Sequence, residues 1–223
     1  MADLIITIDG PAGSGKSTIA HLVAQKLGAG FLDTGAMYRA VTLAAMNAGV
    51  DLTNEDKLLE VFTSTDFQFK LEHGQMTAAI DGHDVTEQIR QPKVTENAQF
   101  IASAPKIRKK LVQLQRDFAA NQKRIVTEGR DQGTIAFVDA DFKFFLTADP
   151  AERTRRRQAQ LKEKGITQTI DQLQKAIEKR DHSDQNRTVG PLKPADDAIV
   201  IDTTDLNIEQ VVENILSYVT KNN

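Results

Sequence analysis

Residues 4–20, LIITIDGPAGSGKSTIA, decide the fold of this 223-residue chain. Residues 4–8 are apolar or β-branched and are followed by Asp9 and Gly10, a pattern typical of a strand buried on both faces of a parallel sheet. From residue 16 to residue 27, apolar side chains recur at helical spacing, and Gly28 and Gly30 are expected to end that helix. A strand, a glycine-rich turn and a helix in this order predict an α/β fold.

Within this stretch, residues 10–17 match the pattern G-x-x-x-x-G-K-S/T of a phosphate-binding loop. The glycines let the backbone curl so that its N–H groups and the following helix N-terminus face phosphate oxygens. Lys16 is placed to bridge the β- and γ-phosphates of ATP, and Ser17 offers a hydroxyl to Mg²⁺. The predicted ATP-binding residues are Gly10, Pro11, Ala12, Gly13, Ser14, Gly15, Lys16, Ser17 and Thr18. The loop indicates nucleotide binding and leaves the phosphate acceptor open.

Helical and strand patterns alternate along the rest of the chain, which favours a parallel sheet. Further strands are expected at residues 124–128, 142–148 and 197–202. Helices are expected at residues 34–47, 55–62, 92–103, 105–121 and 207–219, with a polar helical stretch from 149 to about 182 that Gly165 interrupts. Residues 67–84 alternate in polarity around His73-Gly74, which predicts a small antiparallel hairpin.

Composition excludes several classes of protein. The net charge of −3 gives no global attraction to nucleic acid or to an anionic membrane. No cysteine is present, so disulfides and cysteine-bound metals are excluded, which fits a reducing compartment. No apolar run approaches the roughly 20 residues that span a bilayer, and the N-terminus lacks signal-peptide character. We expect a cytoplasmic protein that binds small molecules, and a monomer because no long apolar surface stripe is left over.

Acidic and basic residues after the second and third expected strands indicate phosphoryl transfer. Glu128 ends its strand and could hold Mg²⁺ directly or through water, or could be a helix cap or a solvated carboxylate. Over residues 151–187, ten Lys and Arg face six Asp and Glu. This excess could be a solvated helix with salt bridges, but beside a phosphate-binding loop we interpret it as a lid that surrounds the transferred phosphoryl group. Arg153 and Arg157 are the predicted catalytic arginines of that lid.

Several motifs in order along the chain resemble those of bacterial cytidylate kinases. They are IDGPAGSGKST (8–18), LDTGAMYRA (32–40), DVTEQIR (84–90), EGRDQGT (128–134), RTRRR (153–157), KRDHSDQNR (179–187) and PLKPADDAIVIDTT (191–204). The resemblance covers almost the whole chain and implies ATP-dependent phosphorylation of CMP and dCMP with Mg²⁺. Gln132, where an apolar residue is more usual, and Gly190, where alanine is, depart from the pattern and bear on local packing.

The resemblance also implies an architecture: a three-layer P-loop fold with a central parallel five-stranded sheet, a β-hairpin insert and an arginine-rich lid. It predicts one domain over residues 1–223. The core would comprise residues 1–33, 91–149 and 188–223, the acceptor-binding region residues 34–90, and the lid residues 150–187.

For the acceptor base, the resemblance implies recognition by Thr34, Arg108 and Asp131. A carboxylate can accept from the amino group of cytosine, and a guanidinium can donate to its ring nitrogen and carbonyl. Uracil has a carbonyl oxygen where cytosine has its amino group, so two hydrogen-bond acceptors would face each other at Asp131. Taken alone, Asp131 could instead cap a helix, and Arg108 could lie on a solvated helical face.

For the acceptor phosphate and sugar, the resemblance implies six further contacts and one packing residue. The phosphate would bind Arg39, Arg130 and Arg90, while the sugar and phosphates would bind Arg180, Asp184 and Arg187. Tyr38 would pack near the acceptor, although a core aromatic fits its pattern equally well. His182 receives no role. Two other functions stay open: a kinase of another small acceptor such as shikimate, and a nucleotide sensor without catalytic activity.

Overall fold

The computed structural model describes residues 2–163 and 165–221, and its central feature is a five-stranded parallel sheet. The strands lie in the order β2-β6-β1-β7-β8, and a separate three-stranded sheet has the order β3-β4-β5. The strands are β1 (Leu4–Asp9), β2 (Gly30–Asp33), β3 (Phe67–Glu72), β4 (Gln75–Ile80), β5 (His83–Asp84), β6 (Arg124–Gly129), β7 (Phe142–Thr147) and β8 (Ile199–Asp202). The helices are α1 (Lys16–Leu27), α2 (Thr34–Asn47), α3 (Glu55–Ser64), α4 (Pro92–Ser103), α5 (Pro105–Ala120), α6 (Pro150–Glu163), α7 (Ile170–Gln185) and α8 (Ile208–Lys221). The predicted α/β class and five-stranded sheet are confirmed.

By its internal contacts, the chain divides into two compact units. The first unit holds residues 29–125 with the first three residues, and the second unit holds residues 4–28 and 126–223. This division does not test the predicted arrangement of core, acceptor-binding region and lid, which stays a prediction.

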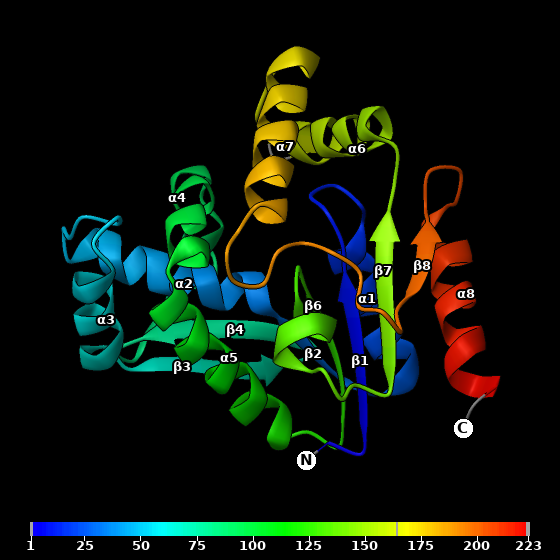
Figure 1. Cartoon of the computed structure of the whole chain (residues 1–223), viewed down its shortest axis with the longest axis horizontal. Coiled ribbons are helices and arrows are strands. Elements are labelled where there is room, and N and C mark those ends of the chain that lie inside the picture. Colours follow the sequence, from blue (N-terminus) through cyan, green and yellow to red (C-terminus); the bar gives the residue numbers. More distant parts are fainter. Residues whose placement is uncertain (1, 164, 222–223) are drawn as a thin grey trace. The chain divides into compact units, whose positions relative to one another are not determined.

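The second unit is built on β1, which pairs in parallel with β7, while β7 pairs in parallel with β8 (Figure 1). Every residue of β1 is buried, as its nearly all-apolar sequence predicts. Helices α1 and α8 pack against each other through apolar faces that include Val23 and Ile215. Because the strands are parallel, their carboxyl ends meet at one edge, where α/β proteins bind their ligands.

The first unit combines helices α2, α3, α4 and α5 with the small antiparallel sheet. Its core centres on the buried face of α2, which includes Met37, Val41 and Leu43 and packs against α4. A short 3-10 helix at Gln88–Arg90 follows the sheet and also contacts α2.

The structure adds elements that the sequence pattern did not locate. Gly30 begins β2, although it was expected to end the preceding helix; Gly28 alone ends α1, in the left-handed conformation at φ 58°. The predicted hairpin is confirmed as β3 and β4, and His83–Asp84 adds a third strand. One turn of π-helix, Gln132–Ala136, follows β6.

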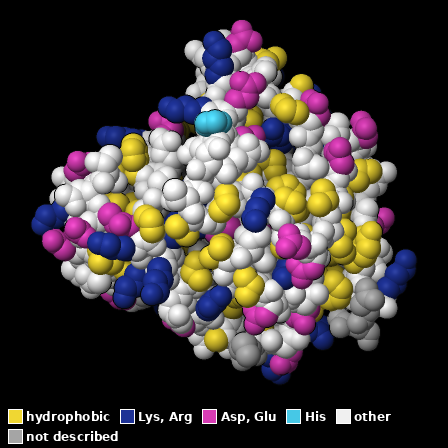
Figure 2. All heavy atoms as spheres, in the orientation of Figure 1, with side chains coloured by type: hydrophobic (Ala, Val, Ile, Leu, Met, Phe, Trp, Pro, Cys, Tyr) yellow, Lys and Arg dark blue, Asp and Glu magenta, His cyan; other side chains and the backbone are white. Residues whose placement is uncertain are grey.

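No helix in the described part of the chain is long and apolar enough to cross a membrane. On the face shown in Figure 2, basic and acidic side chains are interspersed, in keeping with the small net charge.

Candidate active site

The phosphate-binding loop joins the end of β1 to the start of α1 and depends on glycine at defined positions. Gly10, Gly13 and Gly15 all have positive φ, at 155°, 79° and 84°. A Cβ on Gly10 would lie 2.2 Å from the carbonyl oxygen of Leu146 on β7, and one on Gly13 would lie 2.9 Å from the carbonyl oxygen of Arg153. The loop therefore packs too closely on β7 and α6 for a side chain at position 10 or 13.

Lys16, the first residue of α1, is only 6% exposed, and its Nζ donates a hydrogen bond to the carbonyl oxygen of Pro11 at 3.2 Å. Burial lowers the pKa of Lys16 to about 7, and the charge of Arg130 lowers it further while that of Glu128 opposes the shift. A buried ammonium group with a lowered pKa is stabilised when a negatively charged ligand binds beside it.

Ser17 and Glu128 form a pair of oxygen ligands beside that lysine. The Ser17 hydroxyl donates to Glu128 Oε1 at 2.9 Å, and Glu128 is buried, so it is not the solvated carboxylate that the sequence left open. A hydroxyl and a carboxylate are ligands that Mg²⁺ accepts, and this ion commonly uses one or two protein oxygens together with phosphates and water. No cluster of three or more His, Cys, Asp or Glu that could hold a metal occurs within residues 2–163 and 165–221. The residues present thus fit a nucleotide-bound Mg²⁺.

The two predicted catalytic arginines of α6 occupy different environments. Arg153 is buried; its guanidinium donates to the carbonyl oxygens of Ala12 and Ala148, both at 3.1 Å, and pairs with Asp181 on α7. Arg157 is half-buried and forms no hydrogen bond or ion pair with any described residue, and burial lowers its pKa. Arg153 ties α6 and α7 to the phosphate-binding loop, whereas Arg157 has its guanidinium available.

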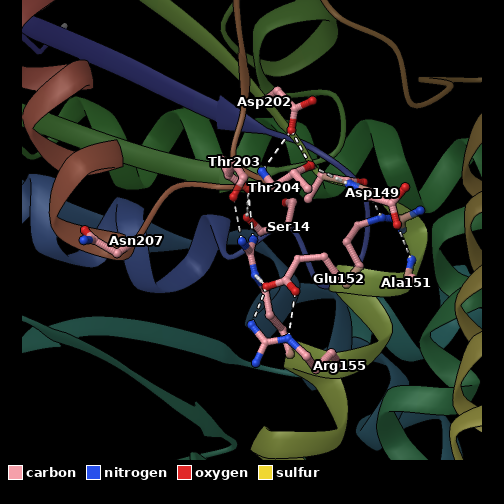
Figure 3. Close-up of polar contacts among 12 residues, drawn as sticks. Ser14, Asp149, Ala151, Glu152, Arg155, Asp202, Thr203, Thr204 and Asn207 are labelled. Atoms are coloured by element: carbon pink, nitrogen blue, oxygen red, sulfur yellow. Dashed lines mark hydrogen bonds and ion pairs between the residues drawn. The ribbon is translucent and has the colours of Figure 1, made fainter.

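Next to Arg153, α6 is fixed to the loop that follows β8 (Figure 3). Arg156 donates to the hydroxyl and the carbonyl oxygen of Thr203 at 3.0 and 2.6 Å and to Glu152 at 2.8 Å. The Thr203 hydroxyl in turn lies 3.0 Å from the carbonyl oxygen of Thr147. Glu152 also pairs with the exposed Arg155, and these hydrogen bonds hold the pKa of Glu152 well below its usual range. The start of α6 is therefore anchored over several residues.

Predicted acceptor-binding residues of the second unit gather around Asp184 on α7. Arg130 Nε donates to Asp184 Oδ2 at 2.8 Å, and Arg187 Nη1 lies 3.8 Å from Asp184 Oδ1. Burial alone would raise the pKa of Asp184, but Arg130, Arg187 and Arg180 together hold it below its ordinary value. Arg180 is exposed on the same helix. The cluster carries a net positive charge at the edge where phosphate would bind.

Asp131 is buried two residues after the end of β6, immediately before the π-helix. Its side chain makes no capping hydrogen bond to that helix, so the helix-cap alternative does not describe it.

In the first unit, Asp33 holds two of the predicted phosphate-binding arginines. Asp33 Oδ1 accepts the backbone N–H of Ala36 at 2.9 Å and so caps α2. Asp33 Oδ2 lies 3.1 Å from Arg39 and 3.6 Å from Arg90. A single carboxylate thus orders two guanidinium groups at the N-terminus of a helix, where anions bind favourably.

Arg108 and Tyr38 also come together in the first unit. Arg108 on α5 is only 2% exposed, donates to the carbonyl oxygen of Ala102 at 3.2 Å, and has its guanidinium carbon 5.6 Å from the centre of the Tyr38 ring. The solvated-face alternative for Arg108 is therefore wrong. Tyr38 is half-buried, and Thr34 is buried at the first position of α2.

The comparisons with known proteins identify the family of this chain. Residues 6–221 match the family model described as cytidylate kinase. The chain belongs to the cytidylate kinase family. It is 47% identical over 216 residues to a cytidylate kinase of Caldicellulosiruptor saccharolyticus, covering 97% of this chain and 95% of the relative. It is 48% identical over 217 residues to that of Azotobacter vinelandii, covering 96% and 94%.

Among solved structures, this cytidylate kinase family member resembles an uncharacterized protein from Eubacterium ventriosum. The TM-score is 0.52 at 15% identity, with 98% of this chain and 99% of that chain covered. A similarity at that identity supports the fold alone.

The sequence did not identify the carboxylates that hold the arginines in place, or the one that binds the π-helical turn after β6. Asp33 orders Arg39 and Arg90, and Asp181 pairs with Arg153. The sequence pattern marks Asp9 only as the residue that bounds the first strand. Asp33 and Asp9 do lie inside the motifs LDTG and IDG, each at the end of a short apolar run, and that position at a strand end is the signal that the sequence offers.

Proposed function

We propose that the chain transfers the γ-phosphoryl group of ATP to a phosphate oxygen of CMP or dCMP, yielding ADP and CDP or dCDP. The observation that supports this most is the match of residues 6–221 to the cytidylate kinase family. The acceptor oxygen forms a bond to the γ-phosphorus as the bond to the β–γ bridging oxygen breaks. A phosphate monoester is largely dianionic at neutral pH, so the acceptor needs no general base.

On the donor side, the backbone N–H groups of residues 10–18 other than Pro11 would hold the phosphates, and Lys16 would bridge the β- and γ-phosphates. Ser17 and Glu128 would hold Mg²⁺, which neutralises charge on the same phosphates when bound. Arg157, which has no described partner, would stabilise the negative charge that spreads over the transferred phosphoryl group. Arg153 would fix α6 to the phosphate-binding loop.

On the acceptor side, Thr34, Arg108 and Asp131 would recognise the cytosine ring. The phosphate and sugar would bind Arg39, Arg90, Arg130, Arg180, Asp184 and Arg187, with Tyr38 packed nearby. The buried state of Arg108 and Asp131 supports base recognition, because a buried polar group left opposed by the wrong base costs about 1–3 kcal/mol. Cytoplasmic location and a monomeric state stay predictions of the sequence.

An ATP-coupled assay over CMP, dCMP, UMP, AMP, GMP and shikimate tests this function. We expect turnover with CMP and dCMP well above the rest, and Asp131→Ala to lower the preference for CMP over UMP by about tenfold or more. Asp139→Ala, which removes an exposed carboxylate eight positions further along the chain, should leave the preference unchanged. ADP release with none of the acceptors would favour the nucleotide sensor, and preference for another acceptor would favour a different kinase.

The lowered pKa of Lys16 predicts proton uptake when ATP binds. At a pKa of about 7, the lysine of the free protein is about 10% protonated at pH 8 and about 90% protonated at pH 6. Phosphates beside Nζ raise the pKa again, so binding should take up close to one proton at pH 8 and about 0.1 at pH 6. Calorimetry in buffers of different ionisation enthalpy measures the uptake. Equal uptake at both pH values, or the same difference in Lys16→Met, would contradict the contact between Lys16 and phosphate.

A further inference from the structure

A buried carboxylate that the proposed chemistry does not use lies between the phosphate-binding loop and Asp131. Asp9 ends β1, immediately before Gly10, and is 4% exposed. Its Oδ1 accepts the backbone N–H of Gln132 at 2.9 Å, and its Oδ2 accepts that of Gly133 at 2.8 Å. Both oxygens therefore bind the two backbone amides that directly follow Asp131.

We propose that Asp9 is a positioning residue that fixes Asp131 for recognition of the acceptor base. This inference rests on the proposed function, in which Asp131 accepts from the amino group of cytosine. The direction of the Asp131 side chain depends on the backbone of the turn it opens, and Asp9 holds that backbone at the next two residues.

The turn has few other ways to satisfy these amides. The first N–H groups of a helix have no partner within it, and Gln132 and Gly133 open the π-helix that follows β6. A buried amide without an acceptor costs on the order of 1–3 kcal/mol, so loss of Asp9 forces the turn to rearrange toward other acceptors or water.

Two other contacts limit where the turn can lie. The Thr127 hydroxyl on β6 donates to Gln132 Oε1 at 3.0 Å. At Gly133, a Cβ would lie 3.0 Å from the Thr7 hydroxyl oxygen on β1 and 3.3 Å from Lys143 Cδ on β7. The turn is thus held from β6 and seated on β1 and β7, and Asp9 supplies its only bidentate contact among the hydrogen bonds described.

The charge state of Asp9 agrees with this role. Burial raises the pKa of Asp9 to about 7, the two amide hydrogen bonds lower it, and the neighbouring charge of Asp131 raises it. The two amides thus favour the charged form of Asp9 against the cost of its burial.

Asp9→Asn tests the proposal, because asparagine has the same shape but presents an N–H₂ group to one of the two amides. We expect the KM for CMP to rise and the preference for CMP over UMP to fall, each by about tenfold, while the KM for ATP stays within about twofold. The matched control is Asp141→Asn. Asp141 also accepts a backbone N–H, that of Ile5 at 2.7 Å, but at the opposite end of β1. This control should change none of the three values by more than about twofold.

Equal rises in the KM for ATP and for CMP, or an unchanged preference in Asp9→Asn while Asp131→Ala loses it, would overturn the proposal. Absence of CMP phosphorylation by the wild-type enzyme would instead refute the proposed function. Amide hydrogen exchange on the wild-type protein tests the contact even if Asp9→Asn does not fold. We expect Gln132 and Gly133 to exchange far more slowly than exposed loop amides, and exchange at the loop rate would overturn the proposal.

Discussion

Lys16→Met is expected to lower kcat for CMP phosphorylation by about 100- to 1,000-fold and to leave the fold intact. The ammonium group would neutralise charge that develops between the β- and γ-phosphates, and methionine fills the same space without charge. The fold should persist because Lys16 is buried at a cost, with its pKa lowered to about 7 and a single hydrogen bond described, to Pro11. Steady-state kinetics with saturating ATP and CMP, together with a thermal melt, measure both effects.

Arg155→Met is the matched control for that substitution. Arg155 is also a cation of the second unit, but it is exposed on α6 and pairs with Glu152. Its loss should change kcat by less than about twofold, because a surface ion pair contributes about 0–1 kcal/mol. Near-normal turnover in Lys16→Met would refute the role given to this lysine, and a comparable loss in Arg155→Met would point to a general effect of net charge.

Gly10→Ala should be the most destabilising single substitution in the phosphate-binding loop. The added Cβ would lie 2.2 Å from the carbonyl oxygen of Leu146 and 3.0 Å from Ser14 Oγ, and the backbone φ of 155° is one that side chains rarely adopt. Because the obstacle at Leu146 is backbone, a rotamer change cannot relieve it, and β1 and β7 must separate. We expect a loss of about 3–5 kcal/mol in the free energy of unfolding, measured by urea denaturation.

Gly28→Ala is the matched control, because it tests the effect of the backbone conformation without a steric clash. Gly28 also has positive φ, 58°, but a Cβ there would meet nothing within 4 Å. Its substitution should lower the free energy of unfolding by about 1–2 kcal/mol, because alanine is less stable than glycine in the left-handed conformation. Equal losses for the two variants would show that close approach to β7 is not what requires glycine at position 10.

Much of the fold could be predicted because its elements are strongly patterned. The nearly all-apolar run of β1 and the helical spacing of α1 gave bounds within one residue of those in the structure. In contrast, β2 has four residues, begins at Gly30 and lies between two helices, so neither length nor alternation distinguishes it from a loop. The π-helix at Gln132–Ala136 has no capping signal and depends on a carboxylate more than 120 positions away in the chain.

Some residues of the candidate site could be predicted from local sequence patterns, and others only from the contacts between elements. The glycine-rich loop and the lysine follow from one short motif, so the sequence alone could predict them. Arg153 and Arg157 share a helical face by spacing, and only the packing of α7 shows that Asp181 engages the first and leaves the second available. Resemblance to a family supplied the acceptor residues, because none of them forms a motif whose chemistry is specific when taken alone.

The contact of Arg153 with Asp181 and with the carbonyl oxygen of Ala12 has a consequence for how α6 and α7 can move. Breaking a hydrogen bond between charged groups costs about 1.5–3 kcal/mol when both groups become hydrated. A motion that separated α7 from α6 would therefore be populated in only about one molecule in 10 to 200 at any moment. Movements that keep the pair intact carry no such penalty. Substrate exchange during turnover should accordingly proceed with α6 and α7 moving together as one body, hinged outside the Arg153–Asp181 contact.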